Sequence, residues 1–515
     1  MKSSFLITGM MLPLLTSFPQ HASAKVHKES KNQTPKNVIF ILSDDHRYDF
    51  MGFMGKVPWL QTPNLDKLAK EGAHLQNAFV TTSLSSPSRA SILTGQYTHE
   101  HTVVDNSAPL PPNLTFFPQY LQKKGYQTAF FGKWHMGNDD GRPQPGFHHW
   151  ESFSGQGTYY NVKLNINGTS VSYPKDVYCI DLLTEHAEEF IEKRNKNKPF
   201  FIYLSHKAVH DPFAASAKHE GMYKDKPIPY PASYNQPSSG SISTVPSKDR
   251  FNKPKTDETW YGDGRMPDWV KNQRESWHGV DYCYFGRRSF EEEVRKYCET
   301  ITSLDESIGN LIKYLEDNNL DENTVIIYMG DNGFSWGEHG LIDKRQFYEE
   351  SVRVPMLAYC PGLIQPKTKI TKMIQNIDIA PTILEIAGIK KAPQMRGLSF
   401  LPMLTGENVT EWRNKLYYEY YWEFDFPQTP TTFGVRTDRY KYIRYHGIWD
   451  TNEFYDLQED PYEMNNLINA PEHQQMIKEL ANDLFDWLES SEGMKIPLKR
   501  TVKHAGGNHR SLKTF

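Results

Sequence analysis

Four short apolar runs, separated by segments with helical periodicity, constrain the fold of this 515-residue chain more than any other feature. The runs are residues 37–43, 127–131, 200–204 and 324–329. A continuous apolar run of this length predicts a strand buried on both faces, as in a parallel sheet covered by helices. The intervening patterns predict those helices, at residues 63–71, 118–124, 181–194 and 289–320. We therefore predict an α/β fold with a large mixed, mostly parallel sheet flanked by helices.

The C-terminal part of the chain departs from this alternation. Short aromatic segments at 415–422, 433–446 and 453–457 precede an amphipathic pattern at 471–490, which predicts a small antiparallel sheet plus a helix. Residues 213–288 are rich in Pro, Ser, Lys and aromatic residues, and we interpret them either as substrate-facing loops or as a surface excursion. We expect a leader at 1–24, a catalytic domain at 25–400, a small α+β subdomain at 401–490 and a basic tail at 491–515.

The first 24 residues have the pattern of a secretory signal peptide. Lys2 precedes an apolar run at 5–15, and Ala22-Ser23-Ala24 provides small residues for cleavage. The run is too short to span a bilayer, so we predict no transmembrane segment. We expect a protein exported by a bacterium, either to the periplasm or to the cell surface or medium.

Charge and cysteine content argue against a nucleic-acid binder and against a protein built on a zinc cluster or a disulfide framework. The chain has 58 basic and 62 acidic residues, a balance that does not indicate a nucleic-acid binder. Its four cysteines contain no CxxC pair, so neither a zinc cluster nor a disulfide framework is predicted. We expect buried free thiols, with one or two disulfides left open.

Oxygen-bearing side chains follow two of the predicted strands. Asp44 and Asp45 come directly after the first strand, and Asp331 and Asn332 follow the strand at 324–329. Adjacent acids at a strand end are often turn residues, but two such pairs at two strand ends indicate a shared cation, because close carboxylates repel. Hard oxygen donors suit Ca²⁺ or Mg²⁺ and disfavour zinc.

A serine-rich segment at 82–95 predicts a loop that leads into a short helix. We expect Ser86 as the N-cap, Pro87 as the first helical residue and Gly95 as the stop. The free N–H groups of such a first turn favour an anion next to Ser85, and Arg89 adds forked donors. A hydroxyl beside an anion cradle points to chemistry on a phosphate or sulfate ester.

The run Ser85-x-Pro87-x-Arg89, continued by Ala90-Ser91-x-Leu93-Thr94-Gly95, resembles the maturation signature of the type I sulfatases. In that family the first residue, Cys or Ser, is oxidised to formylglycine (3-oxoalanine). Three further segments are similar to family motifs: Gly132 to Gly137, the segment from Ser205 to Pro212, and the segment from Asp343 to Pro355.

This resemblance implies an alkaline-phosphatase-like fold and a set of site residues. As ligands of one Ca²⁺ it implies Asp44, Asp45, Ser85, Asp331 and Asn332. As catalytic residues it implies Ser85, Arg89, Lys133, His135, His210 and Lys344. We expect His206, Arg345 and Glu349 to support them.

The resemblance also implies a two-step reaction. One hydroxyl of the aldehyde hydrate, held on calcium, would attack sulfur, and deprotonation of the other would then release sulfate. His210 would protonate the leaving sugar oxygen and His135 would deprotonate the hydrate. Position 85 is Ser rather than Cys, which resembles the substrates of the radical, iron–sulfur anaerobic sulfatase-maturating enzyme.

Within the family, the segments at 331–333, 342–349 and 155–159 are similar to the N-acetylglucosamine-6-sulfatase branch. The implied substrate is the 6-O-sulfate of N-acetylglucosamine in heparan- or mucin-type glycans, with GalNAc, galactose or uronic acid sulfates as alternatives. Candidate substrate-binding residues are Arg345, Arg436 and His446, with Trp449 and aromatic residues of the 213–288 region. The rival functions are a phosphate-ester hydrolase that uses unmodified Ser85 and a non-catalytic glycan-binding protein.

Overall fold

The structure is a computed structural model. It describes residues 36–137, 140–234, 267–274, 276–284, 288–447 and 451–497. The predicted leader lies outside these residues, as do Trp260, Tyr261 and Trp449. No helix within the described ranges combines the length and the apolar character that a membrane crossing needs.

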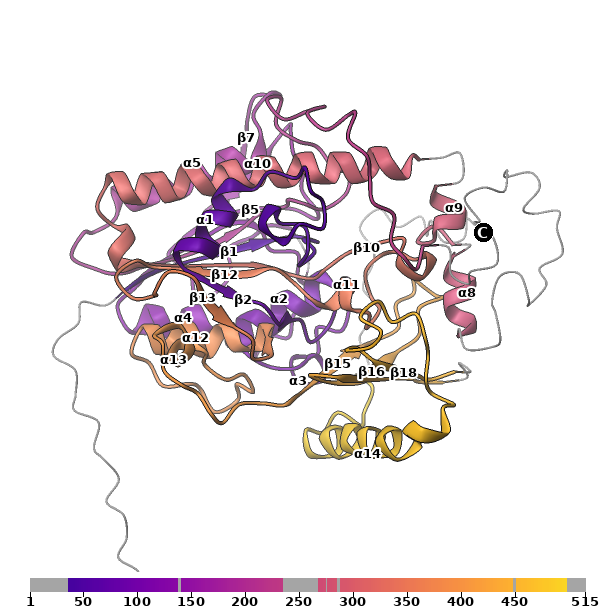
Figure 1. Ribbon diagram of the computed structural model, residues 1–515. Coiled ribbons are helices and arrows are strands. Elements are labelled where there is room, and N and C mark those ends of the chain that lie inside the picture. Colours follow the sequence, from indigo (N-terminus) through magenta and orange to yellow (C-terminus); the bar gives the residue numbers. More distant parts are fainter. Residues whose placement is uncertain are drawn as a thin grey trace, which may run out of the picture. The chain divides into compact units, whose positions relative to one another are not determined.

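A ten-stranded sheet is the central layer of the described chain (Figure 1). Its strands lie in the order β13-β2-β12-β9-β1-β8-β4-β5-β6-β7. Their bounds are β1 (Asn37–Ser43), β2 (Ala73–Leu75), β4 (Gln127–Lys133), β5 (His149–Phe153), β6 (Lys163–Ile166), β7 (Thr169–Ser172), β8 (Phe200–Ser205), β9 (Thr324–Gly330), β12 (Met356–Tyr359) and β13 (Thr368–Ile370). The five strands from β9 to β5 are mutually parallel, whereas β12 and β6 pair antiparallel at the two sides. This arrangement confirms the predicted mixed, mostly parallel sheet.

Helices cover both faces of the sheet, as Figure 1 shows. On one face Ile39 and Ile41 of β1 belong to a hydrophobic cluster with α1 (Pro63–Glu71), α5 (Cys179–Lys193) and α10 (Phe290–Asp317). On the other face Val38, Phe40 and Leu42 share a cluster with α2 (Ser85–Thr94), α4 (Phe117–Lys123) and α12 (Ile379–Ile386). Alternate residues of β1 therefore enter opposite cores, which explains its unbroken apolar sequence.

The predicted small sheet is present at the C-terminal end. It contains β15 (Lys415–Tyr420), β16 (Thr432–Thr437), β17 (Tyr440–Tyr445) and β18 (Glu453–Asp456), paired antiparallel in chain order, and is followed by α14 (Gln474–Ser490). The segment expected as one strand at 433–446 is two strands, because the chain reverses at residues 438–439.

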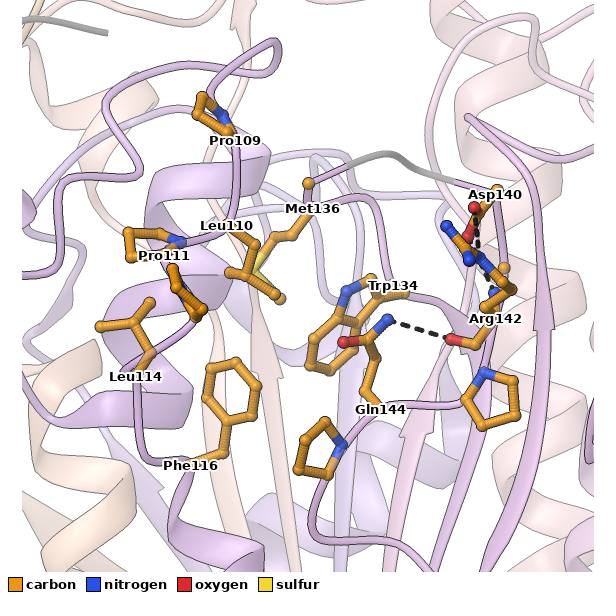
Figure 2. Close-up of a pocket in the computed structure, with 15 residues that line it drawn as sticks. Pro109, Leu110, Pro111, Leu114, Phe116, Trp134, Met136, Asp140, Arg142 and Gln144 are labelled. Carbon is orange, nitrogen blue, oxygen red and sulfur yellow. Dashed lines mark hydrogen bonds and ion pairs between the residues drawn. The ribbon is translucent and has the colours of Figure 1, made fainter. Parts of the chain in front are cut away.

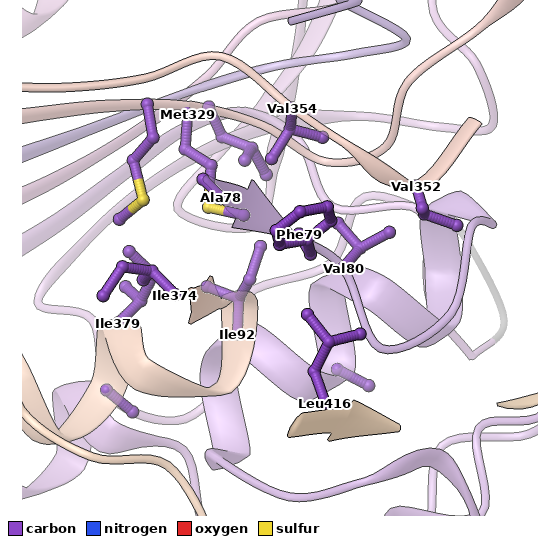
Figure 3. Close-up of a cluster of buried hydrophobic side chains, with 14 of the residues drawn as sticks. Ala78, Phe79, Val80, Ile92, Met329, Val352, Val354, Ile374, Ile379 and Leu416 are labelled. Carbon is purple, nitrogen blue, oxygen red and sulfur yellow. The ribbon is translucent and has the colours of Figure 1, made fainter. Parts of the chain in front are cut away.

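A continuous apolar core joins this small sheet to the helix at the predicted signature (Figure 3). Phe79 from β3 (Ala78–Phe79) and Ile92 from α2 lie in one cluster with Ile374 of β14 (Ile374–Gln375), Ile379 of α12 and Leu416 of β15. Helix α2 therefore packs in a core that is shared by the large and the small sheet.

The remaining described elements are short and lie mostly around the strand ends. They are α3 (Thr98–His101), α8 (Asp268–Arg274), α9 (Val280–Cys283), α11 (Glu349–Val352), α13 (Leu401–Leu404), β10 (Ser335–Trp336) and β11 (Ile342–Asp343), with 3-10 turns at Gly52–Met54, Asp321–Asn323, Glu338–Gly340, Asn376–Asp378 and Pro471–His473. Ser289 caps α10 by accepting from the Glu292 N–H. All four cysteines are free thiols, buried except for the half-buried Cys283.

Candidate active site

The two oxygen-bearing pairs meet at the carboxyl edge of the parallel strands. Ser43 and Gly330, the last residues of β1 and β9, are register partners, so Asp44-Asp45 and Asp331-Asn332 leave the sheet side by side. The Asp45 N–H donates to Asp331 Oδ1 at 3.0 Å, and Asn332 Nδ2 donates to Asp45 Oδ1 at 2.7 Å. The structure thus places all four side chains in one cluster, at the edge where parallel sheets collect their ligands.

Helix α2 carries Ser85 to this cluster in its first turn. The Ser85 hydroxyl donates to Asp44 Oδ1 at 3.4 Å and is fully buried. The predicted cap is wrong by two residues: Leu84 is the N-cap, because the Ser86 hydroxyl is engaged instead with the carbonyl of His135. Gly95 ends the helix in the left-handed conformation (φ 68°), as predicted.

Three buried cations surround the carboxylates. Arg89 Nε and Nη2 lie 3.0 and 2.9 Å from Asp331 Oδ2. Lys133, the last residue of β4, donates to Asp44, and Lys344 Nζ lies 2.5 Å from Asp45 Oδ1. Arg89, Lys133 and Lys344 come from three different elements and converge on one small volume, which suits an anion with several oxygens.

The carboxylates differ in their electrostatic state. Burial, with the neighbouring charges of Asp44 and Asp331, raises the pKa of Asp45 to about 7 against the opposing effect of Lys344. Burial also acts to raise the pKa of Asp44, but the charges of Lys133 and Arg89 outweigh it and hold that pKa well below its usual range.

The donor set fits a hard divalent cation. Asn332 Oδ1 is buried and has no hydrogen-bond partner among the described residues. With the three aspartates it offers only hard oxygen ligands, which Ca²⁺ and Mg²⁺ prefer. Ligand atoms of Asp44, Asp45 and His210 lie within 4.8 Å of one another, so the site is already drawn together.

Both predicted catalytic histidines lie in the cluster as neutral rings. Burial and the charge of Lys133 hold the pKa values of His135 and His210 well below 6.5. His210 Nδ1 donates to the Asp211 carbonyl at 2.5 Å, and its Nε2 lies 3.8 Å from Asp45 Oδ2. A neutral imidazole can accept a proton, so both histidines are candidates for proton transfer in this cluster.

A pocket of about 580 Å³ opens over these groups. Asp45, His210 and Lys344 line it. Its other lining residues include Gln156, Trp277, His278, Trp336, Asp343, Arg345 and Phe426. The described part of the 213–288 region thus contributes pocket residues, which favours the interpretation as substrate-facing loops. Sequence reasoning did not assign Gln156, His278 or Phe426, although the glycines on both sides of Gln156 mark a built turn.

Of Arg345, Arg436 and His446, the three residues predicted individually as substrate contacts, Arg345 alone lines the pocket. Its guanidinium lies 3.3 Å from the centre of the Phe426 ring and pairs with Glu423 at 2.8 Å. Arg436 does not line the pocket, because it pairs with buried Glu349 at 2.8 Å.

His446 is exposed and also lies outside the pocket lining. The substrate-binding roles of Arg436 and His446 therefore stay predictions, without support from the lining of this pocket. Glu349 and His206, which we expect to support the site, contact different groups. Glu349 in α11 pairs with Lys441 of the small sheet. His206 is fully buried, and neither of its ring nitrogens has a hydrogen-bond partner in the described chain.

A second pocket of about 420 Å³ lies beside residues 133–137, the segment that carries Lys133 and His135 (Figure 2). Trp134 and Met136 line it, together with prolines of the segments at 109–112 and 143–145. Side chains of this segment alternate between two environments. Lys133 and His135 contact the polar cluster, whereas Trp134 and Met136 line the second pocket. None of the predicted catalytic side chains lines this second pocket.

The mostly parallel sheet with helices on both faces and an oxygen-rich cluster at its carboxyl edge corresponds to the alkaline-phosphatase-like fold. A phosphonate monoester hydrolase of Agrobacterium radiobacter shares that fold, with a TM-score of 0.67 at 19% identity over 91% of this chain and all of its own. A family model described as Sulfatase matches residues 36–389, and one described as N-sulphoglucosamine sulphohydrolase, C-terminal, matches residues 337–490. The chain belongs to the sulfatase family and is an enzyme of that class.

Individual proteins of known activity are also similar to this chain. An N-acetylglucosamine-6-O-sulfatase of Bacteroides thetaiotaomicron is 33% identical, over 96% of this chain and 93% of its own length. The human N-acetylglucosamine-6-sulfatase is 31% identical, over 75% of this chain and 67% of its own. A structure solved with its substrate D-glucosamine-2-N,6-O-disulfate has a TM-score of 0.76 at 32% identity, over 90% of this chain and 99% of that one.

Proposed function

We propose that this sulfatase removes the 6-O-sulfate of N-acetylglucosamine or a related glucosamine in heparan- or mucin-type glycans, using a formylglycine formed from Ser85 and one Ca²⁺. The observation that carries the proposal is the convergence of buried Ser85, two oxygen-bearing pairs and three cations in one cluster. The choice of sugar rests on the similar proteins, whose names and bound substrate specify glucosamine 6-sulfates.

The residues of the cluster divide the work of sulfate-ester hydrolysis. Arg89, Lys133 and Lys344 hold sulfate oxygens whose charge changes during transfer, which stabilises the transition state. His210 gives a proton to the leaving sugar oxygen, and the charge of a bound sulfate would raise the pKa of that ring toward its acid form. His135 takes a proton from the group at position 85, and each such proton transfer typically contributes roughly 10²–10⁴-fold.

The two groups that the family implies complete this chemistry. Calcium held by Asp44, Asp45, Asp331, Asn332 and position 85 would neutralise sulfate charge and favour an ionised hydroxyl at position 85. A formylglycine hydrate at position 85 supplies one hydroxyl as nucleophile and a second whose deprotonation releases sulfate, which a plain serine lacks.

The maturation and export of the enzyme follow from the same proposal. A serine at position 85 assigns the conversion to an anaerobic sulfatase-maturating enzyme, which would act before or during export to the periplasm or beyond. The pocket that receives the sugar has Trp277 and Phe426 in its lining, and aromatic faces of this kind suit the apolar face of a pyranose ring.

The test is a desulfation screen of the protein produced with and without that maturating enzyme. Mass spectrometry of the peptide around Ser85 should show the aldehyde only in the first sample, and only that sample should release sulfate from N-acetylglucosamine 6-sulfate. The Ser85→Ala variant is the matched inactive control. Activity of a protein with an intact serine would refute formylglycine as the nucleophile. Preferential turnover of GalNAc, galactose or uronic acid sulfates would refute N-acetylglucosamine 6-sulfate as the substrate.

A further inference from the structure

Gln156 connects two residues of the catalytic cluster through the two ends of one side-chain amide. Lys133 Nζ lies 2.5 Å from Gln156 Oε1, and Gln156 Nε2 lies 3.0 Å from His135 Nε2. Gln156 also lines the pocket of about 580 Å³ above the cluster. A single side chain therefore spans the catalytic lysine, the catalytic histidine and the space where the substrate enters.

The chemistry of these partners determines which atom donates in each bond. A lysine ammonium has donors and no acceptor, so the carbonyl end of the amide must face Lys133. The NH₂ end must then face His135, and because it can only donate, His135 Nε2 must accept. An accepting Nε2 carries a lone pair, so the neutral imidazole holds its single proton on Nδ1.

The turn that presents Gln156 is constrained by its neighbours. Gly155 and Gly157 both have positive φ values, 61° and 65°, which non-glycine residues rarely adopt. A Cβ atom at position 157 would lie 2.4 Å from the ring of Phe153, the last residue of β5. The backbone of this turn is thus packed directly against the end of a sheet strand, which fixes where the amide can reach.

We propose that Gln156 is a positioning residue that holds His135 as the Nδ1–H tautomer, with the basic lone pair on Nε2 where Gln156 contacts it, and orients the Lys133 ammonium. Lys133 then donates both to Asp44 and to Gln156, and this pairing limits the directions in which its remaining N–H can point. The role given to His135 rests on the proposed function; the hydrogen-bond assignment does not.

Two substitutions separate orientation from simple bulk. Gln156→Glu keeps the size and still accepts from Lys133, but a carboxylate has no donor, so His135 Nε2 must become the protonated nitrogen. Gln156→Ala removes both bonds, and we expect kcat to fall by roughly tenfold to a hundredfold, part of the contribution of one proton transfer. KM should change by less than about threefold, because Arg89 and Lys344 still bind sulfate.

The first measurement is neutron diffraction from deuterium-exchanged crystals of the calcium-loaded protein. We expect deuterium on His135 Nδ1 and none on Nε2 in the wild type, and deuterium on Nε2 in Gln156→Glu. Deuterium on Nε2 in the wild type, or an unchanged tautomer in Gln156→Glu, would overturn the proposal. The wild-type map alone decides this point if the variant does not fold.

The second measurement compares kcat and KM of the matured variants on any sulfate ester that the wild type hydrolyses. Gln144→Ala is the matched control, because Gln144 lines the other pocket and its amide donates to the Arg142 carbonyl at 3.1 Å. We expect Gln144→Ala to match the wild type. An unchanged kcat in Gln156→Ala refutes the positioning role. A wild type that hydrolyses no ester refutes the proposed function, and the neutron result then still decides the assignment of the amide.

Discussion

Replacement of Arg436 by methionine is the sharpest test of how the small sheet supports the site. The Arg436 guanidinium donates to both oxygens of Glu349, at 2.8 and 3.1 Å, and both side chains are more than 90% buried. Burial acts to raise the pKa of Glu349, but Arg436 and Lys441 outweigh it and lower that pKa. Arg353 also lies 4.0 Å from Glu349, so the substitution leaves a buried carboxylate with one of its three cations removed.

The expected cost follows from what remains. Breaking a buried ion pair by removing one partner typically costs about 3–5 kcal/mol. Lys441 Nζ stays 2.9 Å from Glu349 Oε1, which keeps part of the compensation, so we expect about 3 kcal/mol. Since Arg436 lies outside the pocket, KM for the sulfate ester should not change.

The assay is urea unfolding followed by tryptophan fluorescence, with Arg439→Met as the matched control. Arg439 also pairs with a carboxylate, Asp456, but its side chain is 46% exposed, and surface pairs contribute little. An Arg436→Met midpoint no lower than that of Arg439→Met would refute the reasoning. A double variant with Glu349→Gln should recover part of the loss, because no unpaired buried charge then remains.

Three further outcomes follow from described contacts. Burial acts to lower the pKa of His99, but the hydrogen bond to Glu419 outweighs burial and raises that pKa. The pair therefore stabilises the fold fully below about pH 6.5, and less as the pH rises past the pKa of the folded state. In urea unfolding His99→Gln should lose more stability at acidic than at alkaline pH, and an equal loss at both would contradict the pairing. Gly434→Ala should cost about 1–3 kcal/mol in thermal unfolding, since a Cβ there would lie 2.3 Å from the Phe347 ring, and a wild-type melting temperature would exclude this clash. Calcium at a hundredfold excess over its Kd should stabilise the wild type by about 2.7 kcal/mol relative to chelated protein, and Asn332→Ala should lose part of that gain in calorimetry; no calcium effect on the wild type would count against the cation site.

The sequence predicted the large sheet well because its strands are buried on both faces. Residues 37–43 form β1 with the predicted bounds, and the polar residues after it lie at the sheet edge as expected. The predicted strand at 433–446 was too long, since the reversal at Asp438-Arg439 carries no glycine or Asn-Gly signal. Local pattern thus located the elements, and only tertiary pairing revealed that turn.

The candidate site was predictable where the chemistry requires a particular residue type. Asp44, Asp45, Asp331 and Asn332 converge because parallel neighbouring strands end together. The pairing of Arg436 with Glu349 could not be predicted, because the two residues are 87 positions apart and nothing in the local sequence indicates that contact. The Ser86 cap failed for a similar reason: its hydroxyl is used by the distant His135 carbonyl.

The adjacency of β1 and β9 also means that the site can be completed only after most of the chain has been synthesised. The aspartates after β1 cannot meet their counterparts until residue 332 has been synthesised, a separation of 286 positions between Asp45 and Asp331. In the finished fold the serine of the signature has no exposed surface. Any enzyme that modifies it must therefore reach the nascent or unfolded polypeptide, and protein that folds unmodified would have to be unfolded before it could be converted.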